Sequence, residues 1–293
     1  MKGFLLRWAN RVAGFSRSRN AAVALAVLVA LVLIGAFAPW ISPQNPYDLA
    51  QLDVLEGRLP PGSHSATGKL YLLGTDDQGR DMLSGIFYGL RSSLVAAGSS
   101  TLIALAIGLA LGLAAAWFGG WFEDLVMRLV DIQLSFPSIL IALVLLALLG
   151  QGLDKIVIAL VSVQWAYYAR TVRATALAER RKDYIQAAVA LAIPGRRIVA
   201  RHLLPNCLPP LLVVAALQIA AAITLEATLS FLGLGLPITE PSLGLLIANG
   251  YAYLLSGKYW ISVFPGITLL VTIVCVNVVA DRLRELLTPG LGN

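Results

Sequence analysis

Long apolar runs alternate with shorter polar segments along this sequence. The first run, from Ala21 to Trp40, contains no charged residue, and a helix needs about 20 apolar residues to cross a bilayer. Because the apolar part of a signal peptide is only about 7–15 residues long, this run predicts an uncleaved transmembrane helix at 21–41. The pattern as a whole predicts an all-α integral membrane protein with six transmembrane helices. The other five are expected at about 94–118, 134–149, 156–169, 208–231 and 259–280.

The third of these runs is short for a membrane crossing. The segment before it, 121–133, is amphipathic, and we expect it to extend that helix to the cytoplasmic surface. The second run contains Gly98, Gly108 and Gly112 among alanines. Small residues let transmembrane helices approach one another closely, so we expect the second helix to lie at a helix–helix contact.

Lysines and arginines set the orientation of the predicted helices, because short cytoplasmic loops are enriched in them. The N-terminal tail, 1–20, holds five of them and no acidic residue, and 170–201 holds eight against two acidic residues. By contrast, 42–90 holds six acidic residues against three basic ones. Six helices with the tails 1–20 and 283–293 both in the cytoplasm satisfy this distribution.

The predicted outer segments are of two kinds. Residues 42–90 are rich in proline and glycine, which favour turns and extended chain. We expect a small irregular cap with one helix there, not an independent domain. The outer loop at about 233–258 is also rich in glycine and proline but keeps an apolar stretch at 243–247, which predicts a short re-entrant or interfacial helix.

Composition supports a membrane protein. Charged residues make up 13% of the chain and hydrophobic residues 58%, whereas soluble proteins carry about 25% charged residues. The distribution of charge among the loops accounts for the net charge of +6, so membrane lipid is an expected partner and nucleic acid is not. Cys207 and Cys275 lie in or beside apolar runs, and their spacing predicts neither a disulfide framework nor a metal site.

Catalytic chemistry has little support in the sequence. No G-x-x-x-x-G-K-[ST] loop is present, so the chain is not expected to bind ATP by that route. His64 and His202 fall on opposite sides of the predicted membrane and would not share a metal ion. No convincing pair of nucleophile and base is found. We therefore expect no catalytic residue, no metal and no cofactor on this chain.

Glu226 is the main ionisable residue within a predicted transmembrane helix. An acid in this position is a candidate functional residue by default. The alternative, which we favour, is a structural role as a hydrogen-bonding partner in helix packing or for the adjacent glycine-rich turn. An ion-coupled secondary transporter would more often show several such groups in relay, and it remains the alternative from another class; a membrane enzyme comes third.

The segment 183–206, DYIQAAVALAIPGRRIVARHLLPN, is too charged to cross a membrane and too apolar for a solvated loop. It resembles the EAA loop of type I ABC importer permeases, the cytoplasmic segment that docks on the ATPase subunit. Residues 186–188 stand for Glu-Ala-Ala, Ala192 for a glycine, and 204–205 for a final Leu-Pro. Gln replaces the Glu and Ala replaces the Gly.

The missing glycine bears on the turn between the two short helices that the resemblance implies. Pro194-Gly195 follows shortly after, and we expect the break at that position instead. Small side chains such as Ala188 would let these helices sit in an apolar groove of the ATPase, together with Ile198. The nearby arginines, Arg201 included, either pair with acidic groups at the rim of that groove or only hold the loop in the cytoplasm. The expected docking residues are Gln186, Ala187, Ala188, Leu191, Ala192, Pro194, Gly195, Arg196, Arg197, Leu204 and Pro205.

Three further blocks, 73–94, 226–247 and 264–291, look like the permeases of dipeptide, oligopeptide and nickel importers, and match the subunit usually called C. The resemblance covers nearly the whole chain. It implies a type I permease core of five helices at 91–282, preceded by the N-terminal helix, with the coupling loop at about 176–207. It also implies the cytoplasmic (inner) membrane of a bacterium.

The same resemblance implies partners. A homologous permease would complete a heterodimer, two ABC ATPase subunits would bind ATP and Mg²⁺, and an extracytoplasmic binding protein would deliver substrate. Di- or oligopeptides are the expected substrates. Nickel or metal chelates, opines and peptide-like antibiotics are alternatives, because the binding protein usually sets selectivity in this family.

Overall fold

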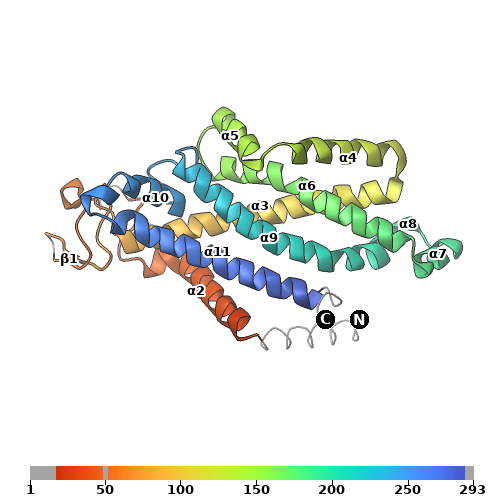
Figure 1. Cartoon of the computed structure of the whole chain (residues 1–293), viewed down its shortest axis with the longest axis horizontal. Coiled ribbons are helices and arrows are strands. Elements are labelled where there is room, and N and C mark those ends of the chain that lie inside the picture. The colour runs from red at the N-terminus through yellow and green to blue at the C-terminus, as the bar shows by residue number, and fades with distance from the viewer. Residues whose placement is uncertain (1–17, 49–51, 67, 288–293) are drawn as a thin grey trace.

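A computed structural model describes residues 18–48, 52–66 and 68–287 of the chain. Figure 1 shows an elongated helical bundle, with the strands and a short helix at one end and two short helices at the other. We call the first end, formed by residues 42–81 and α10, the cap end, and the second, formed by α7, α8 and η3, the loop end. The elements are α2 (Arg19–Ile41), η2 (Val54–Glu56), β1 (Ser63–His64), β2 (Leu70–Tyr71), α3 (Met82–Phe118), α4 (Gly120–Ser135), α5 (Ser138–Leu149), α6 (Leu153–Arg180), α7 (Asp183–Ala190), α8 (Gly195–Ile198), η3 (Val199–Leu203), α9 (Leu204–Phe231), α10 (Leu243–Tyr251), η4 (Leu254–Ser256) and α11 (Trp260–Leu287).

Four helical stretches in the described part of the chain are long and apolar enough to cross a membrane: α2, α3, α11 and a stretch formed by α8, η3 and α9. The pair α4 and α5 qualifies only if it is counted together as one bent span. The helix α6 is 28 residues long and lies within the bundle (Figure 1), but its second half is basic. The structure is therefore the expected all-α membrane protein, and the count of six crossings stays a prediction.

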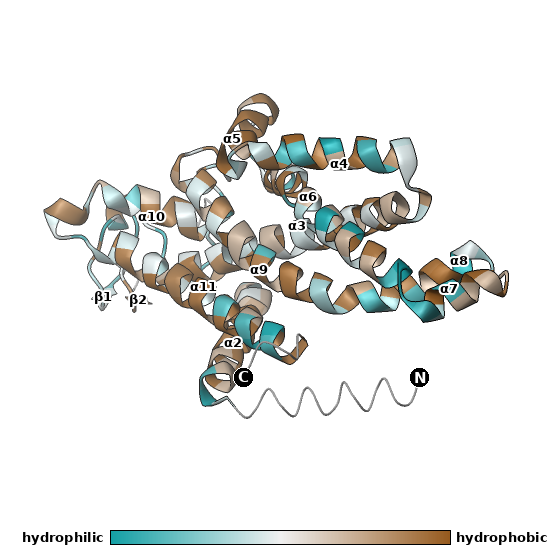
Figure 2. Cartoon of the chain, turned by 45° about the vertical axis from the view of Figure 1, so that its right-hand side comes forward, coloured by the Kyte–Doolittle hydropathy of each residue, from teal (hydrophilic) through white to brown (hydrophobic). Residues whose placement is uncertain are grey.

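The amphipathic segment before the third run does not extend the following helix, and that prediction was wrong. The helices α4 and α5 meet at an angle of 92°. Pro137 occupies the N-cap of α5, and proline has no N–H with which to continue the hydrogen bonds of the preceding helix. Figure 2 shows mixed polar and apolar colouring along α4, whereas α5 is almost entirely apolar.

The helices α3 and α6 approach one another closely. A Cβ atom at Gly108 would lie 2.5 Å from Tyr168 Cβ, and one at Gly112 would lie 2.6 Å from the Ala169 carbonyl oxygen. Only glycine fits at these two positions, as the sequence pattern suggested. Gly98 has open space beside it, so it makes no such contact.

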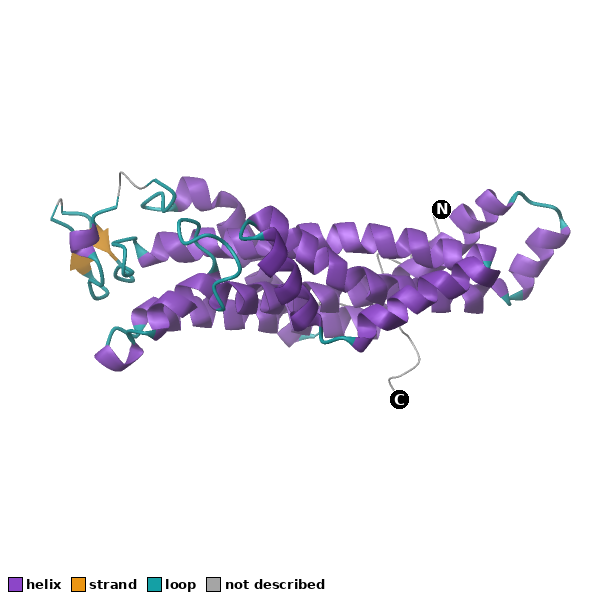
Figure 3. Cartoon of the chain, turned by 90° about the horizontal axis from the view of Figure 1, so that it is seen from above, coloured by secondary structure: helices purple, strands orange, loops and turns teal. Residues whose placement is uncertain are grey.

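The cap end is irregular, as expected, and contains a small antiparallel sheet in which Ser63 pairs with Tyr71 and His64 with Leu70. Figure 3 places these strands at the extreme of the long axis. The helix that follows begins at Met82, well before the predicted 94. Asp81 caps it by accepting a hydrogen bond from the Ser84 N–H at 2.9 Å, which satisfies a free donor of the first turn.

The expected short helix in the loop at 233–258 is α10. Ser242 caps it by accepting from the Leu245 N–H at 3.1 Å. A Cβ at Gly89 would lie 3.0 Å from the Leu243 nitrogen, and one at Gly244 would clash with the Ala227 carbonyl. Glycines on both sides of the contact thus seat α10 tightly against α3 and α9.

Candidate functional site

The predicted docking segment forms the loop end of the molecule, beyond the ends of α3 and α6 (Figure 1). It comprises two short helices and then a five-residue π-helical segment, η3, that leads without a break into α9. The Leu204 N–H bonds to the Val199 carbonyl, five residues back. Pro205, just inside α9, has no N–H to donate to a preceding carbonyl, and π-bulges absorb such interruptions. Leu204 and Pro205 therefore belong to a continuous bulged helix.

The turn between α7 and α8 lies at Ala192, so the predicted shift of the break to Pro194-Gly195 was wrong. Ala192 has φ 55°, in the left-handed region that a glycine adopts without strain. Its N–H bonds to the Val189 carbonyl at 2.9 Å, and the Ile193 N–H bonds to the Ala188 carbonyl at 3.1 Å. This pair of bonds is the Schellman arrangement that ends many helices. Alanine thus takes the glycine conformation here.

Gly195 serves a different purpose from the one predicted. A Cβ atom there would clash with Cζ2 of Trp117, so the first turn of α8 packs directly on that indole ring. Pro194 precedes it as the N-cap of α8 and accepts hydrogen bonds from the N–H groups of Arg197 and Ile198, at 2.8 and 3.2 Å. The pair fixes where α8 sits against α3.

The predicted docking helices have an inner and an outer face, and Ala188 and Ile198 lie on the inner face, contrary to the prediction from the sequence. Ala188 is 5% exposed and Ile198 is 1% exposed, and both belong to an apolar cluster of this chain. They cannot line a surface for a partner protein. The outer face instead carries Leu191, which is 76% exposed. Leu191 is the C-cap of α7, and the exposed members of the helix itself are Asp183, Tyr184, Gln186, Ala187, Val189 and Ala190.

A polar cluster that the sequence analysis missed braces the loop from behind. Glu179 accepts hydrogen bonds from Lys182 Nζ at 2.5 Å and from the Tyr184 hydroxyl at 2.6 Å. Asn206 Nδ2 donates to the Tyr184 hydroxyl at 3.1 Å, which links α6, α7 and α9. Burial and the hydrogen bond to Glu179 raise the pKa of Tyr184 to about 12, so the phenol remains a donor. In the sequence, the only sign of this cluster is the acid Glu179 and the base Lys182 just before the apolar stretch of α7.

Arg180 completes the brace on the side of α3. Its guanidinium lies 5.4 Å from the ring centroid of Trp117 and donates to the Trp117 carbonyl at 3.2 Å. Free carbonyls at a helix C-terminus attract cations. Gln186 Nε2 donates to the Arg180 carbonyl at 3.0 Å, a bond that the glutamate of the EAA pattern could not donate. Arg196 and Arg197 are exposed.

Glu226 lies in a closed polar pocket between α3 and α9. It is 1% exposed, and its two carboxylate oxygens accept hydrogen bonds from Ser93 Oγ at 2.7 Å and Ser230 Oγ at 2.8 Å. A Cβ at Gly235 would clash with Ser230, so the glycine-rich turn closes over this pocket. Helix packing and support of the turn are the roles that this geometry suits.

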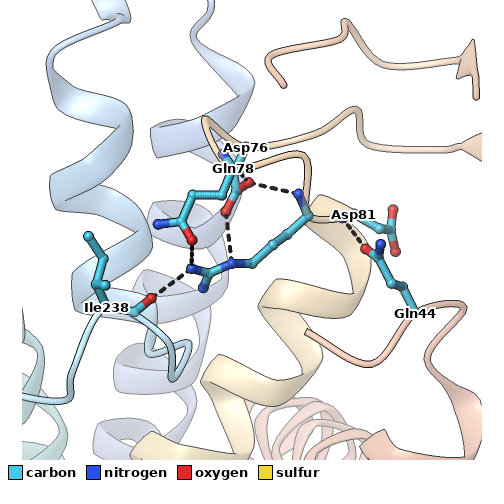
Figure 4. A network of polar contacts seen from close by, with 6 residues as sticks. Gln44, Asp76, Gln78, Asp81 and Ile238 are labelled. Atoms are coloured by element: carbon cyan, nitrogen blue, oxygen red, sulfur yellow. Dashed lines mark hydrogen bonds and ion pairs between the residues drawn. The ribbon is translucent and has the colours of Figure 1, made fainter. Parts of the chain in front are cut away.

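A second polar network, drawn in Figure 4, lies at the cap end, which is the opposite end of the molecule from the docking segment (Figure 1). Arg80 is 1% exposed; its guanidinium donates to the Ile238 carbonyl at 2.6 Å and contacts Gln78, and its Nε lies 3.7 Å from Asp76. Asp76 also accepts the N–H groups of Gln78 and Arg80, both at 2.8 Å. Burial raises the pKa of Asp76 to about 6 against the effect of Arg80. The network ties the cap to the loop at 233–258.

Among the described residues, no group of three or more His, Cys, Asp or Glu side chains is placed to hold a metal ion. His64 lies in β1 and His202 in η3, at opposite ends of the bundle.

Comparisons with known proteins agree along most of the chain. The family described as binding-protein-dependent transport system inner membrane component matches residues 82–293, and the N-terminal TM domain of oligopeptide transport permease C matches residues 7–61. The dipeptide transport system permease protein DppC of Escherichia coli K12 is 39% identical over 94% of this chain and 91% of its own length. The di/tripeptide transport system permease protein DppC of Pseudomonas aeruginosa is 36% identical over 95% and 91%.

Among solved structures, the chain is similar in fold to a chain of the inward-facing MetNI methionine ABC transporter. The two superimpose with a TM-score of 0.57 at 22% identity, over 71% of this chain and 98% of that one.

Proposed function

Because the chain belongs to the family of binding-protein-dependent transport system inner membrane components, we propose that it is the permease subunit of an ATP-driven importer of di- and oligopeptides in a bacterial cytoplasmic membrane. Relatives at 36–39% identity are named as permeases for dipeptides and tripeptides. That favours peptides over the nickel, chelate, opine and antibiotic substrates that the resemblance left open.

The loop end supports this function most directly. It presents exposed apolar side chains, Leu191 at 76% and Val189 at 54% exposure, on a helix that is held from behind by Glu179 and Arg180. Exposed apolar groups beside a charged rim are typical of protein interfaces. This rigid support is needed if a movement of α7 is to be transmitted to α3, α6 and α9. The partner that fits is a cytoplasmic ATPase subunit.

In this proposal the chain itself is non-catalytic, and ATP and Mg²⁺ bind the two ATPase subunits. Closure of the ATPases would move the two coupling loops together and shift the permeases between inward-open and outward-open states. A homologous permease would form the other half of the path, and an extracytoplasmic binding protein would deliver the peptide at the cap end. Both tails of the chain would then lie in the cytoplasm.

The test is the pair of substitutions Leu191→Asp and Leu255→Asp in the complete complex. Both leucines are exposed, Leu255 fully so at 103%, but they lie at opposite ends of the molecule. Leu191→Asp should abolish co-purification of the ATPase subunits and peptide uptake into proteoliposomes, and Leu255→Asp should leave co-purification intact. Retention of the ATPase subunits by Leu191→Asp, in a chain that folds normally, would rule out this docking surface.

A further inference from the structure

An apolar groove that the proposed function does not use opens at the loop end of α3. Its volume is about 490 Å³, and only one of its lining residues, Arg196, is polar. Ala110, Ala114, Trp117 and Phe118 form the wall on α3, and Val199 closes it from η3. The groove is therefore a slot between the end of a transmembrane helix and the coupling loop.

The groove continues an exposed apolar stripe that runs along α3. Ile103, Ile107, Ala110, Ala114 and Phe118 follow one another at three- or four-residue spacing, which places them on one face of the helix. Phe118 is 74% exposed, Ile103 46% and Ile107 39%. On a membrane-spanning helix such a face meets lipid tails or another membrane helix, and the groove lies where this face reaches the end of the helix.

Arg196 gives the groove its charge. It is exposed, and it forms none of the ion pairs found among the described residues. Trp121, 75% exposed, is the second residue of α4, the helix that follows α3, and exposed tryptophan is characteristic of the level of lipid headgroups. An apolar slot below a cation at this level is complementary to one molecule with an acyl chain and an anionic head. Basic pockets between transmembrane helices bind such headgroups.

We propose that this groove binds an anionic phospholipid of the leaflet at the loop end, with one acyl chain along α3 and the phosphate paired with Arg196. The lipid would touch α3 and η3 at once, next to the contact between Gly195 and Trp117. It would thereby stabilise the position of the coupling loop. This assigns Arg196 to lipid and leaves Arg197, which does not line the groove, for the protein partner. The inference requires only that α3 spans a membrane and not that the chain transports peptides.

Native mass spectrometry of the complete complex (this chain, its permease partner and the ATPase subunits), titrated with phosphatidylglycerol or phosphatidylcholine, tests the proposal. Arg196→Gln should weaken retention of phosphatidylglycerol about fivefold, the effect of one basic residue near an anionic surface. Ala114→Trp should block the same binding without changing the charge. Arg197→Gln and Arg201→Gln are the charge-matched controls, and both should retain the lipid.

Three outcomes would overturn the site. Arg196→Gln could bind phosphatidylglycerol like the parent chain; all three arginine variants could lose it equally, which would indicate general surface charge; or Arg196→Gln could lose only the ATPase subunits, which would place Arg196 in a protein interface. Because this experiment measures bound lipid, a negative result would reject the lipid site alone. It can be told apart from a negative result of the Leu191→Asp experiment, which measures bound ATPase subunits and peptide uptake.

Discussion

At the cap end, Arg80 is 1% exposed and the groups it contacts all belong to this chain, whereas at the loop end Leu191 is 76% exposed with no cover from the described residues. The first network links a sequence-local turn to Ile238 across 158 residues, and so holds the cap and the outer loop as one unit. At the loop end, the polar groups of Glu179 and Arg180 lie behind the exposed face of α7. The buried Arg80 network is held by groups of this chain, whereas Leu191 lies on the exposed surface that the proposed ATPase partner would cover.

The largest effect should come from disrupting the Arg80 network at the cap end. Arg80→Met would leave the carboxylate of Asp76 buried without its cation, and loss of one partner of a buried pair costs about 3–5 kcal/mol. The midpoint of thermal unfolding of the complex should fall sharply. Asp76→Asn in the same chain should recover part of the loss. Lys155→Met, which breaks the exposed pair with Asp154, is the control and should change little; equal effects of Arg80→Met and Lys155→Met would refute the distinction.

The second prediction separates the inner and outer faces of α7. Ala188→Asp would bury a charge among Ile185, Leu203 and other apolar residues of this chain, and an unpaired buried charge costs about 3 kcal/mol or more. Ala187→Asp places the same charge on the exposed neighbouring position. We expect the first variant to lose folded protein on size-exclusion chromatography, and the second to fold normally but lose the ATPase subunits. Folded Ala188→Asp protein that lacks only its partners would restore the original assignment of Ala188.

The third prediction concerns the contact that seats the loop on α3. Gly195→Ala would force a methyl group into the Trp117 ring, and overpacking of this kind costs about 1–3 kcal/mol. We expect α8 to shift, with faster hydrogen exchange at 195–203 and less transport per ATP hydrolysed. Gly98→Ala adds the same methyl group in open space on α3 and should be neutral or slightly stabilising. If both variants behave alike, Trp117 does not position the loop.

Hydropathy alone predicted most of the helices, because a membrane-spanning helix is determined chiefly by length and apolar content. It was wrong where a single residue decides the geometry, as at Pro137, which turns α5 by 92° from α4. It also could not sort the faces of α7, since Ala187 and Ala188 are the same residue type. Burial against the chain's own core and docking against a partner both favour alanine.

The polar networks were the least predictable part of the molecule. Arg80 and Ile238 are far apart in the sequence, and the accepting group is a backbone carbonyl, which carries no residue signature. Glu179 and Tyr184 are close in sequence, yet their bond depends on how α7 turns back against α6. Gln186 looked like a weakened EAA pattern, although its amide donates a bond to the Arg180 carbonyl that a carboxylate could not.

The smallest effect, and the finest test of the loop end, lies at Ala192. Its φ of 55° costs an L-residue about 1–2 kcal/mol relative to a right-handed conformation, and glycine avoids most of that cost. Ala192→Gly should therefore stabilise the turn by about 1 kcal/mol, seen as slower hydrogen exchange of the Ile193 amide. Ala190→Gly, two residues earlier and still helical, should cost about 0.5–1 kcal/mol. If Ala192→Gly stabilises the loop and Ala190→Gly destabilises it, the turn lies at Ala192. If both variants destabilise it, the break between the helices lies at Pro194-Gly195.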